Sequence, residues 1–286
     1  MILPHSKQRR RRRSGGREVS ASAADKGLSS GAVRFLSDSE KARIHSTALD
    51  VLETVGFANA PDFTRKTLLR AGCIETASGR LTFPRTLVED AIASARSLLV
   101  LYGQKPEHDI ELTGSRTYYA TGCGSIMVVD ALRRRTRPMT AADVYDFARL
   151  ADALDHVDMF HCCGTPTDID DTDAVDLNLF YACIRWTAKP TSLSWFNGEN
   201  VRLCVNMMQD VLGGVRNWRA RPCISNVCTF VVPPLKFSSE ACRGLEHSIR
   251  LGMPVQLCSS GQLGATSPVT FAGSIVQTMA EVLGGL

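Results

Sequence analysis

No two cysteines in this sequence are separated by two residues, although the chain has ten cysteines among its 286 residues. This absence excludes zinc ribbons and thioredoxin-like sites, which are built from Cys-x-x-Cys pairs. Two cysteines, Cys162 and Cys163, are adjacent, and the ten form no even framework for disulfides. Reduced thiols are typical of the cytoplasm, and we expect the protein to be cytoplasmic.

Long apolar runs are also absent. The longest, from Cys223 to Leu235, is interrupted by Ser, Asn, Thr and Pro and is shorter than the roughly 20 residues of a membrane-spanning helix. The basic N-terminal stretch is not followed by the apolar core of a secretory signal. With 44% hydrophobic and 22% charged residues, the composition predicts a globular protein of one or two domains, outside the membrane.

Acidic residues are missing from the first 17 positions, which contain seven basic ones. The formal net charge is +4, but without those seven the chain has 26 basic against 29 acidic residues, so its body is mildly acidic. The arginine run beside Ser14-Gly15-Gly16 cannot bury apolar surface, and we expect residues 1–32 to be a disordered basic arm. Contact with RNA or with an acidic partner is the alternative, but no basic face recurs later, so no nucleic acid is expected.

The segment 33–138 mixes helical and strand-like patterns. Ser37 and Glu40 are spaced as a capping box, and apolar residues at helical intervals continue to Gly56. Tight turns are expected at Gly114 and Gly124, between short strand-like stretches. This segment therefore predicts an α+β unit, with further helices at 61–72 and 85–97 and a hairpin turn at 77–79.

From residue 139 to residue 286 the sequence becomes periodic. The expected strands begin at Val157, Thr191, Pro222 and Pro254, at intervals of 34, 31 and 32 residues. Such a repeat predicts an α/β fold with parallel strands and right-handed helical crossovers. Four units match the first half of a (β/α)8 TIM-type barrel, and a small doubly wound sheet is the alternative. Helices are expected at 141–153, 172–186, 199–212, 238–251 and 268–283, and strands at 157–163, 191–196, 222–232 and 254–259.

A loop of small residues, Gly264, Ala265, Thr266 and Ser267, lies between the fourth strand and the last helix. Loops in this position form the carboxyl face of a barrel, where barrel enzymes carry out their chemistry. Thr266 or Ser267 could cap a helix with Pro268 in its first turn, leaving free amides that point into the barrel mouth. The alternative is a loop that supplies only a tight turn and a cap.

Three stretches resemble a known family: LSDSEKARIHSTALDVLETVG, YYATGCGSIMVVDALRRRTRPMTAADV and GATSPVTFAGSIVQTMAEVLGGL. Together they resemble the trimethylamine methyltransferase family of corrinoid-dependent enzymes, from about Phe35 to the last residue. The resemblance implies a (β/α)8 barrel that moves a methyl group from a tertiary or quaternary methylamine, such as trimethylamine or a betaine, to the cobalt of a corrinoid. That corrinoid belongs to a partner protein, so no cofactor is expected to bind this chain tightly.

Members of that family are longer than this chain. The resemblance therefore implies that the gene continues past Leu286 with about four more βα units, and that the full-length protein is a homo-oligomer. In the trimethylamine-specific branch a pyrrolysine lies beyond this point. A truncated, inactive product is the alternative, and an aldolase-like barrel is a more distant one, because neither Lys189 nor Lys236 is placed as a reactive lysine.

Aromatic residues at the end of the second expected strand are the candidates for substrate binding. A quaternary ammonium needs no acid to leave, but it needs a site that tolerates a permanent cation, which aromatic faces provide. Trp195 and Phe196 end that strand, and Glu199 follows with a carboxylate. The alternative is that these aromatics belong to the core.

His161, Cys162 and Cys163 at the end of the first expected strand raise the question of a metal. Adjacent residues on a strand face opposite ways, so only His161 and Cys163 could converge, and we expect no metal site. His161 is instead expected as a buried or hydrogen-bonded histidine, or as a polar group at the mouth. The acidic run from Asp168 to Asp173 is expected to cap a helix, and no catalytic residue is identified.

Overall fold

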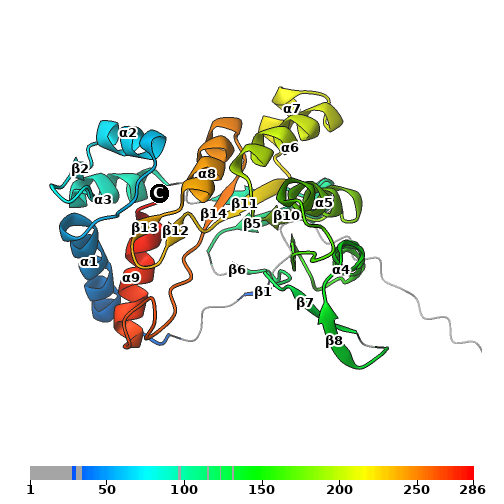
Figure 1. The fold of residues 1–286 in the computed structure, drawn as a ribbon, viewed down its shortest axis with the longest axis horizontal. Coiled ribbons are helices and arrows are strands. Elements are labelled where there is room, and N and C mark those ends of the chain that lie inside the picture. Colours follow the sequence, from blue (N-terminus) through cyan, green and yellow to red (C-terminus); the bar gives the residue numbers. More distant parts are fainter. Residues whose placement is uncertain (1–27, 30–33, 96–97, 115, 123, 131) are drawn as a thin grey trace, which may run out of the picture.

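A computed structural model of the protein describes residues 28–29, 34–95, 98–114, 116–122, 124–130 and 132–286. Its centre is a four-stranded sheet in the order β14-β11-β10-β9, in which all pairs are parallel. Helices lie against this sheet, and smaller helices and hairpins surround it (Figure 1). The strands are β9 (Phe160–His161), β10 (Thr191–Leu193), β11 (Ile224–Cys228) and β14 (Val255–Leu257).

The predicted βα repeat is confirmed, with helices close to their expected bounds and shorter strands. Two insertions were not predicted: a short helix broken off from α6 at Gly213-Gly214, and a hairpin after β11. Both glycines have positive φ, of 79° and 126°, which explains why the helix stops there. The elements are α4 (Ala141–Ala153), α5 (Thr172–Arg185), α6 (Gly198–Val211), α7 (Val215–Ala220), β12 (Val231–Val232), β13 (Lys236–Phe237), α8 (Ser239–Leu251) and α9 (Phe271–Leu283).

The two faces of the sheet differ in polarity. Phe160 and Leu193 are buried in an apolar core shared with α4, α5 and α6. The alternate positions carry His161, Ser192 and Ser225, which lie opposite one another in the strand register. One face is therefore apolar and covered by helices, and the other is lined by small polar groups.

The N-terminal segment agrees with its prediction in most elements. Ser37 and Glu40 form the predicted capping box at the start of the first helix, and the hairpin around residues 77–79 is present. The third helix ends at Ser94 because Ala95 is already extended, three residues before the predicted end. The elements are α1 (Asp38–Thr54), α2 (Asp62–Ala71), β2 (Ile74–Glu75), β3 (Leu81–Thr82), α3 (Arg85–Ser94), β4 (Leu99–Leu101), a 3-10 turn (Pro106–His108), β5 (Ile110–Leu112), β6 (Arg116–Thr117), β7 (Met127–Asp130) and β8 (Arg135–Pro138).

A second core joins the N-terminal helices to the end of the βα repeat. Phe57, which follows α1, packs against Phe230 and Phe237, with ring centroids 6.3 Å and 4.8 Å away. Ala280 of α9 belongs to the same buried cluster, and α1 lies against α9. The helices of the first segment thus cover the side of the sheet next to β14.

Two isolated bridges flank β9 at the outer edge of the sheet. Ala120 and Ser125 form parallel bridges to Met159 and Gly164, on either side of β9. The amide of Thr121 also donates to the Met159 carbonyl at 3.3 Å. Within the described residues, β14 is therefore the end of the sheet without a further strand.

The amino ends of the central strands are closed by the β4–β5 hairpin. Asp109 in this hairpin accepts two hydrogen bonds from Arg221, at 2.8 and 2.9 Å, just before β11. Gln104 donates to the carbonyls of Ile184 and Thr187, at the end of α5 and beyond it. Access to the sheet from outside is thus left at the carboxyl ends of the strands.

Most of the expected N-terminal arm lies outside the described residues. Its two described residues, Leu28–Ser29, form a short strand, β1, paired with β6, so the arm is not disordered throughout. No helix in the described ranges has both the length and the apolar character needed to cross a bilayer.

Asp143 at the start of α4 holds the base of the β7–β8 hairpin. Arg137 of β8 donates to both carboxylate oxygens at 2.6 and 2.7 Å, and the Thr140 amide donates at 2.9 Å. Hydrogen bonding from Arg137, followed by that from Thr140, holds the pKa of Asp143 well below its usual range. Since the folded pKa lies below the unfolded value of about 3.9, Asp143 stabilises the fold above that pH and this contribution is lost as pH falls.

Replacing Asp143 with asparagine should therefore lower the free energy of unfolding by about 1–3 kcal/mol at pH 7. The difference from the parent should shrink as pH falls below about 4, because protonation removes the same charge from the parent. Urea unfolding at several pH values measures this difference in the free energy of unfolding. Asp146→Asn is the control, since Asp146 is an exposed residue of the same helix. A stability difference between Asp143→Asn and the parent that stays constant with pH would contradict this account.

Candidate functional site

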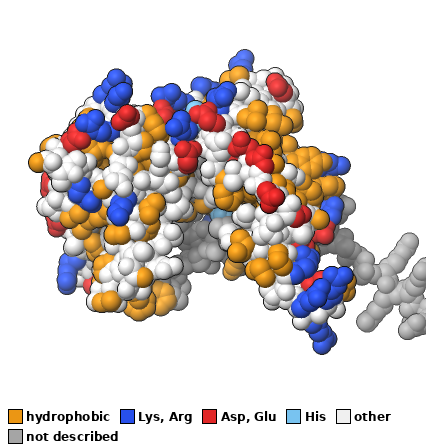
Figure 2. Space-filling model, in the orientation of Figure 1, with side chains coloured by type: hydrophobic (Ala, Val, Ile, Leu, Met, Phe, Trp, Pro, Cys, Tyr) orange, Lys and Arg blue, Asp and Glu red, His pale blue; other side chains and the backbone are white. Residues whose placement is uncertain are grey.

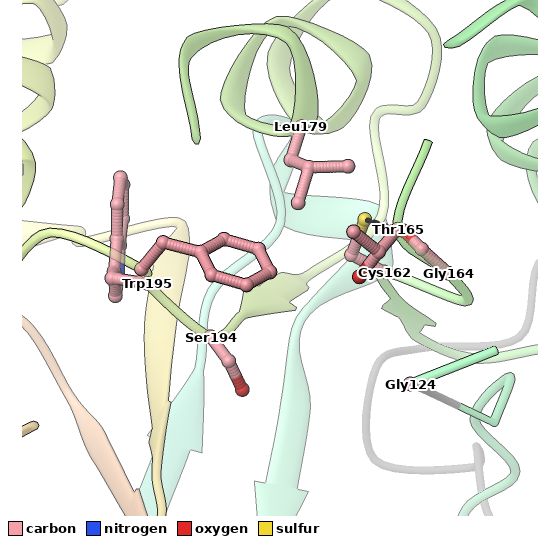
Figure 3. Close-up of a pocket in the computed structure, with 8 residues that line it drawn as sticks. Gly124, Cys162, Gly164, Thr165, Leu179, Ser194 and Trp195 are labelled. Atoms are coloured by element: carbon pink, nitrogen blue, oxygen red, sulfur yellow. Dashed lines mark hydrogen bonds between the residues drawn. The ribbon is translucent and has the colours of Figure 1, made fainter. Parts of the chain in front are cut away.

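A cavity of about 140 Å³ opens at the carboxyl ends of β9 and β10, and we call it the rim cavity. Figure 3 shows Trp195 on one side of it and Cys162 and Thr165 across from the ring, with Leu179 of α5 nearby. Drug-sized ligands occupy roughly 300 Å³ or more, so this space suits a small molecule. Its lining is Gly124, Cys162, Gly164, Thr165, Leu179, Ser194, Trp195 and Phe196.

None of the described residues that line the rim cavity carries a carboxylate, an ammonium or a guanidinium group. Leu179 and the Trp195 ring supply apolar surface, and Thr165 and Ser194 supply hydroxyl groups. Ser194 donates to the Val227 carbonyl at 2.9 Å, which links the end of β10 to β11. The chemistry of this lining is that of an aromatic, uncharged pocket with two hydroxyls.

Trp195 separates the rim cavity from a second one of about 120 Å³. Its ring packs against the core beneath α5 and α6, and its Nε1 is buried with no hydrogen-bond partner among the described residues. Phe196, in contrast, is 48% exposed. The structure therefore places both predicted aromatics at the same cavity, with Trp195 partly in the core and Phe196 at the surface.

Asp176 of α5 fixes the loop that carries these two aromatics, and it was not predicted as a functional residue. Its carboxylate is fully buried and accepts hydrogen bonds from the Phe196 and Asn197 amides at 3.0 Å each. The Asn200 side chain donates to the same carboxylate at 2.9 Å. Burial raises the pKa of Asp176 above its usual range, while these three donors act in the opposite direction.

A signal for Asp176 was present in the sequence. The residue lies in the stretch AVDLNLF, where an acidic side chain interrupts the apolar face of a predicted helix. A buried carboxylate is costly unless it receives hydrogen bonds, so its position indicates that it binds another part of the chain. The pattern alone does not say which part.

Glu199 does not lie in the rim cavity, and the expectation of a desolvated carboxylate beside Trp195 is wrong for this residue. It is the second residue of α6, and its carboxylate turns outward toward α8. There it lies 3.3 Å from His247 and 3.5 Å from Arg243. The hydrogen bond from His247 is the largest cause that lowers the pKa of Glu199. The Arg243 guanidinium, rather than a substrate, lies opposite its charge.

His161 lies on the polar face of the sheet and is not among the residues that line the rim cavity. Its Nε2 is buried and has no hydrogen-bond partner within the described residues, so of the two expected environments burial is the one found. Burial lowers the pKa of His161, which favours the neutral ring. The described residues hold no group of three His, Cys, Asp or Glu side chains that could bind a metal ion.

The acidic run before α5 caps the helix as predicted. Asp171 is the N-cap and accepts from the Asp173 amide at 2.9 Å. Asp168 accepts from the Ala141 amide, at the start of α4. Asp173 also accepts from the Asn197 and Asn200 side chains, which adds to the support that Asp176 gives the aromatic loop.

The loop from Gly264 to Ser267 follows β14 and so lies at the carboxyl edge of the sheet, but its amides do not point outward. The amides of Ala265, Thr266 and Ser267 all donate to the Gln262 carbonyl. The prediction of free amides is therefore wrong. Gly264 has a φ of 78°, which a glycine adopts without strain and which closes this tight turn.

The last helix begins later than predicted, with Thr270 rather than Thr266 or Ser267 as its N-cap. Thr270 accepts from the Gly273 amide at 3.2 Å. The two predicted caps are used elsewhere: Ser267 is hydrogen-bonded to Ser274, and the Thr266 hydroxyl accepts from the Gln262 amide. The loop is thus a self-contained turn beside the helix.

Comparison with known proteins matches the sequence of this chain to a family. The model of the family described as trimethylamine methyltransferase (MTTB) matches residues 5–286. The chain is 32% identical to trimethylamine methyltransferase MttB of Desulfitobacterium hafniense over 252 residues, which cover 87% of this chain and 50% of that protein. It is 28% identical to MttB1 of Methanosarcina acetivorans, over 88% of this chain and 52% of that protein.

A relative with another substrate in its name also matches. The chain is 25% identical to the glycine betaine methyltransferase of Desulfitobacterium hafniense, over 88% of this chain and 52% of that protein. The chain therefore spans about half the length of the curated relatives it matches.

Proposed function

The chain belongs to the trimethylamine methyltransferase family, and from this membership we propose that the full-length protein transfers a methyl group from a small tertiary or quaternary methylamine to a corrinoid on a partner protein. The observation that carries the proposal is the rim cavity, a small uncharged pocket with the Trp195 ring in its wall. The names of the relatives support both trimethylamine and glycine betaine as substrates.

We propose that the four parallel strands are the first half of a (β/α)8 barrel. The regular βα repeat supports this, as does the length of the relatives, of which this chain covers about half. A fifth strand would pair with β14, the end strand that has no further neighbour in the described part of the chain. The polar face with His161 and Ser192 would then line the barrel interior.

In this proposal the chain's own residues bind and orient the substrate. A methylated ammonium against the face of Trp195 gains roughly 0.5–2 kcal/mol from the cation–π interaction. When the nitrogen is quaternary, or a tertiary amine bound in its protonated form, the carbon–nitrogen bond breaks with its electron pair remaining on nitrogen and a neutral amine leaves. No acid is then needed, which fits the absence of acidic groups among the described residues of the lining. The partner's corrinoid supplies the cobalt that accepts the methyl group. Leu179 and the aromatic rings would keep water away from the reacting carbon.

The rim of the cavity is open enough for a large group held by a partner. Gly124 lines the cavity, and a Cβ built at this residue would meet no atom within 4 Å. A Cβ at Gly264, in the loop after β14, would meet only Val269, at 3.5 Å. Small residues with free space in front of them fit the approach of a broad, flat cofactor.

The proposal is tested by replacing the aromatics. In the full-length protein, Trp195→Leu or Phe196→Leu should lower kcat/KM about ten- to thirtyfold, because the removal of one aromatic face costs about 1–2 kcal/mol. The assay is methylation of added cob(I)alamin with glycine betaine, carnitine or trimethylamine as donor. Trp186→Leu is the control, since that indole stacks with Arg149 and Arg185 away from the rim cavity.

Parental rates in both variants on all three donors would remove Trp195 and Phe196 from the site. The alternative to an active enzyme is a truncated product that keeps this half of the fold without activity. An assay of the 286-residue chain beside the full-length protein separates the two.

A further inference from the structure

The β7–β8 hairpin projects from the body of the protein and ends in an exposed basic tip. Figure 2 shows Lys and Arg side chains gathered at its end, at the lower right of the view. The tip consists of Leu132, which is 97% exposed, and the exposed residues Arg133, Arg134 and Arg135. We call these four residues the hairpin tip.

The charges of the hairpin tip are only partly neutralised. Arg133 lies 3.8 Å from Asp130 at the end of β7. Arg134 and Arg135 form no ion pair with any carboxylate in the described part of the chain. Two exposed arginines that form no ion pair with the described residues, on a protein whose body is mildly acidic, leave a local positive charge that extends into solvent.

The two faces of the hairpin differ. Met127 and Val129 are exposed on one face, where their cross-strand neighbours are Pro138 and Thr136. On the other face, Arg137 is bound by Asp143 of α4, which fixes the hairpin to the body. An exposed apolar strip that leads to an arginine tip has the composition of a protein interface, in which methionine and arginine are enriched.

The base of the hairpin belongs to the rim cavity. Gly124 lines that cavity, and Ser125 bridges to Gly164, another lining residue. The Met139 amide, after β8, donates to the Ile126 carbonyl at 3.0 Å and closes the base. The hairpin therefore rises directly from the edge of the cavity.

We propose that the β7–β8 hairpin is a docking arm for an acidic surface on the protein that carries the methyl acceptor. The arginines of the tip attract that surface, and the apolar strip packs against it after contact. A protein partner fits better than a nucleic acid, because a nucleic-acid surface would carry basic residues along the whole face instead of Met127, Val129 and Pro138. This inference rests on the function proposed above, and it adds where the partner binds.

The test is a charge reversal in the full-length protein, Arg134→Glu with Arg135→Glu. The matched control is Arg216→Glu with Arg219→Glu, which reverses two exposed arginines on α7, in the connection that leads into the amino end of β11. Methyl transfer is measured to free cob(I)alamin and to a purified corrinoid protein that the parent methylates. We expect kcat/KM for the corrinoid protein to fall about tenfold at low salt and to approach the parental value at high salt. Rates with free cob(I)alamin should not change.

Each other outcome overturns the inference in its own way. Equal rates of parent and hairpin variant with the corrinoid protein would show that the tip does not dock it. Loss of binding to a short DNA duplex, with transfer unchanged, would assign the tip to nucleic acid. A changed oligomeric state, with transfer unchanged, would assign it to a second copy of this chain. If the parent itself transfers no methyl group to free cob(I)alamin, the proposed function fails and this inference fails with it.

Discussion

Replacing Asp176 with alanine is expected to lower the free energy of unfolding by about 3 kcal/mol and kcat/KM by on the order of a hundredfold. The change would leave the part-buried Phe196 and Asn197 amides without this acceptor, and the Asn200 side chain would keep only its hydrogen bond to Asp173. Each unsatisfied buried donor costs about 1–3 kcal/mol, and the loop can recover part of that by moving toward water. Such a movement would displace Trp195 and Phe196 from the rim cavity.

Two further variants separate positioning from general stability. Asp176→Asn keeps one acceptor oxygen but sets an amide group against an N–H donor. We therefore expect about half of the loss in the free energy of unfolding that Asp176→Ala causes. Asp170→Ala removes an exposed carboxylate before the same helix and should change neither quantity. Stability is measured by urea unfolding, and activity as separate values of kcat and KM for the methylamine. Parental KM and kcat in a folded Asp176→Ala protein would show that the loop does not need this anchor.

The Ala265→Trp change in the full-length protein should reduce methyl transfer more than a hundredfold with little loss of stability. Ala265 is exposed, and its turn is held by backbone hydrogen bonds to the Gln262 carbonyl that a larger side chain leaves intact. The loop lies at the carboxyl edge of the sheet, where the proposed partner would bring its corrinoid. An indole projecting from this turn would block that approach, because transfer requires close and aligned contact.

The control for Ala265→Trp is Ala77→Trp, which adds the same indole to an exposed turn of the β2–β3 hairpin. Both variants should unfold at parental urea concentrations, and only Ala265→Trp should lose transfer to the corrinoid protein. Free cob(I)alamin is smaller than the loaded partner. The Ala265→Trp protein should therefore methylate it faster than it methylates the corrinoid protein, but more slowly than Ala77→Trp does. Normal transfer by a folded Ala265→Trp protein would refute the placement of the loop.

Local sequence patterns determined the helices of this protein and the order of its βα units. A capping box such as Ser37 with Glu40 acts within one turn of chain, and apolar residues at helical intervals depend only on near neighbours. The regular spacing of strands predicted four parallel strands, since each crossover needs a helix and two loops. The aromatics at the end of β10 were also found in this way, because strand ends can be read from the same pattern.

The tertiary structure alone decided how the ends of these elements meet. Glu199 follows the aromatics closely in sequence, yet the fold brings His247 and Arg243 to it and turns it away from the rim cavity. Asp176, 20 residues before Phe196, holds the aromatic loop instead. Several polar side chains near a strand end can bond, cap a helix or remain exposed, and their local patterns do not distinguish these fates. The choice depends on which distant donors, acceptors and charges the packed helices bring within hydrogen-bonding distance.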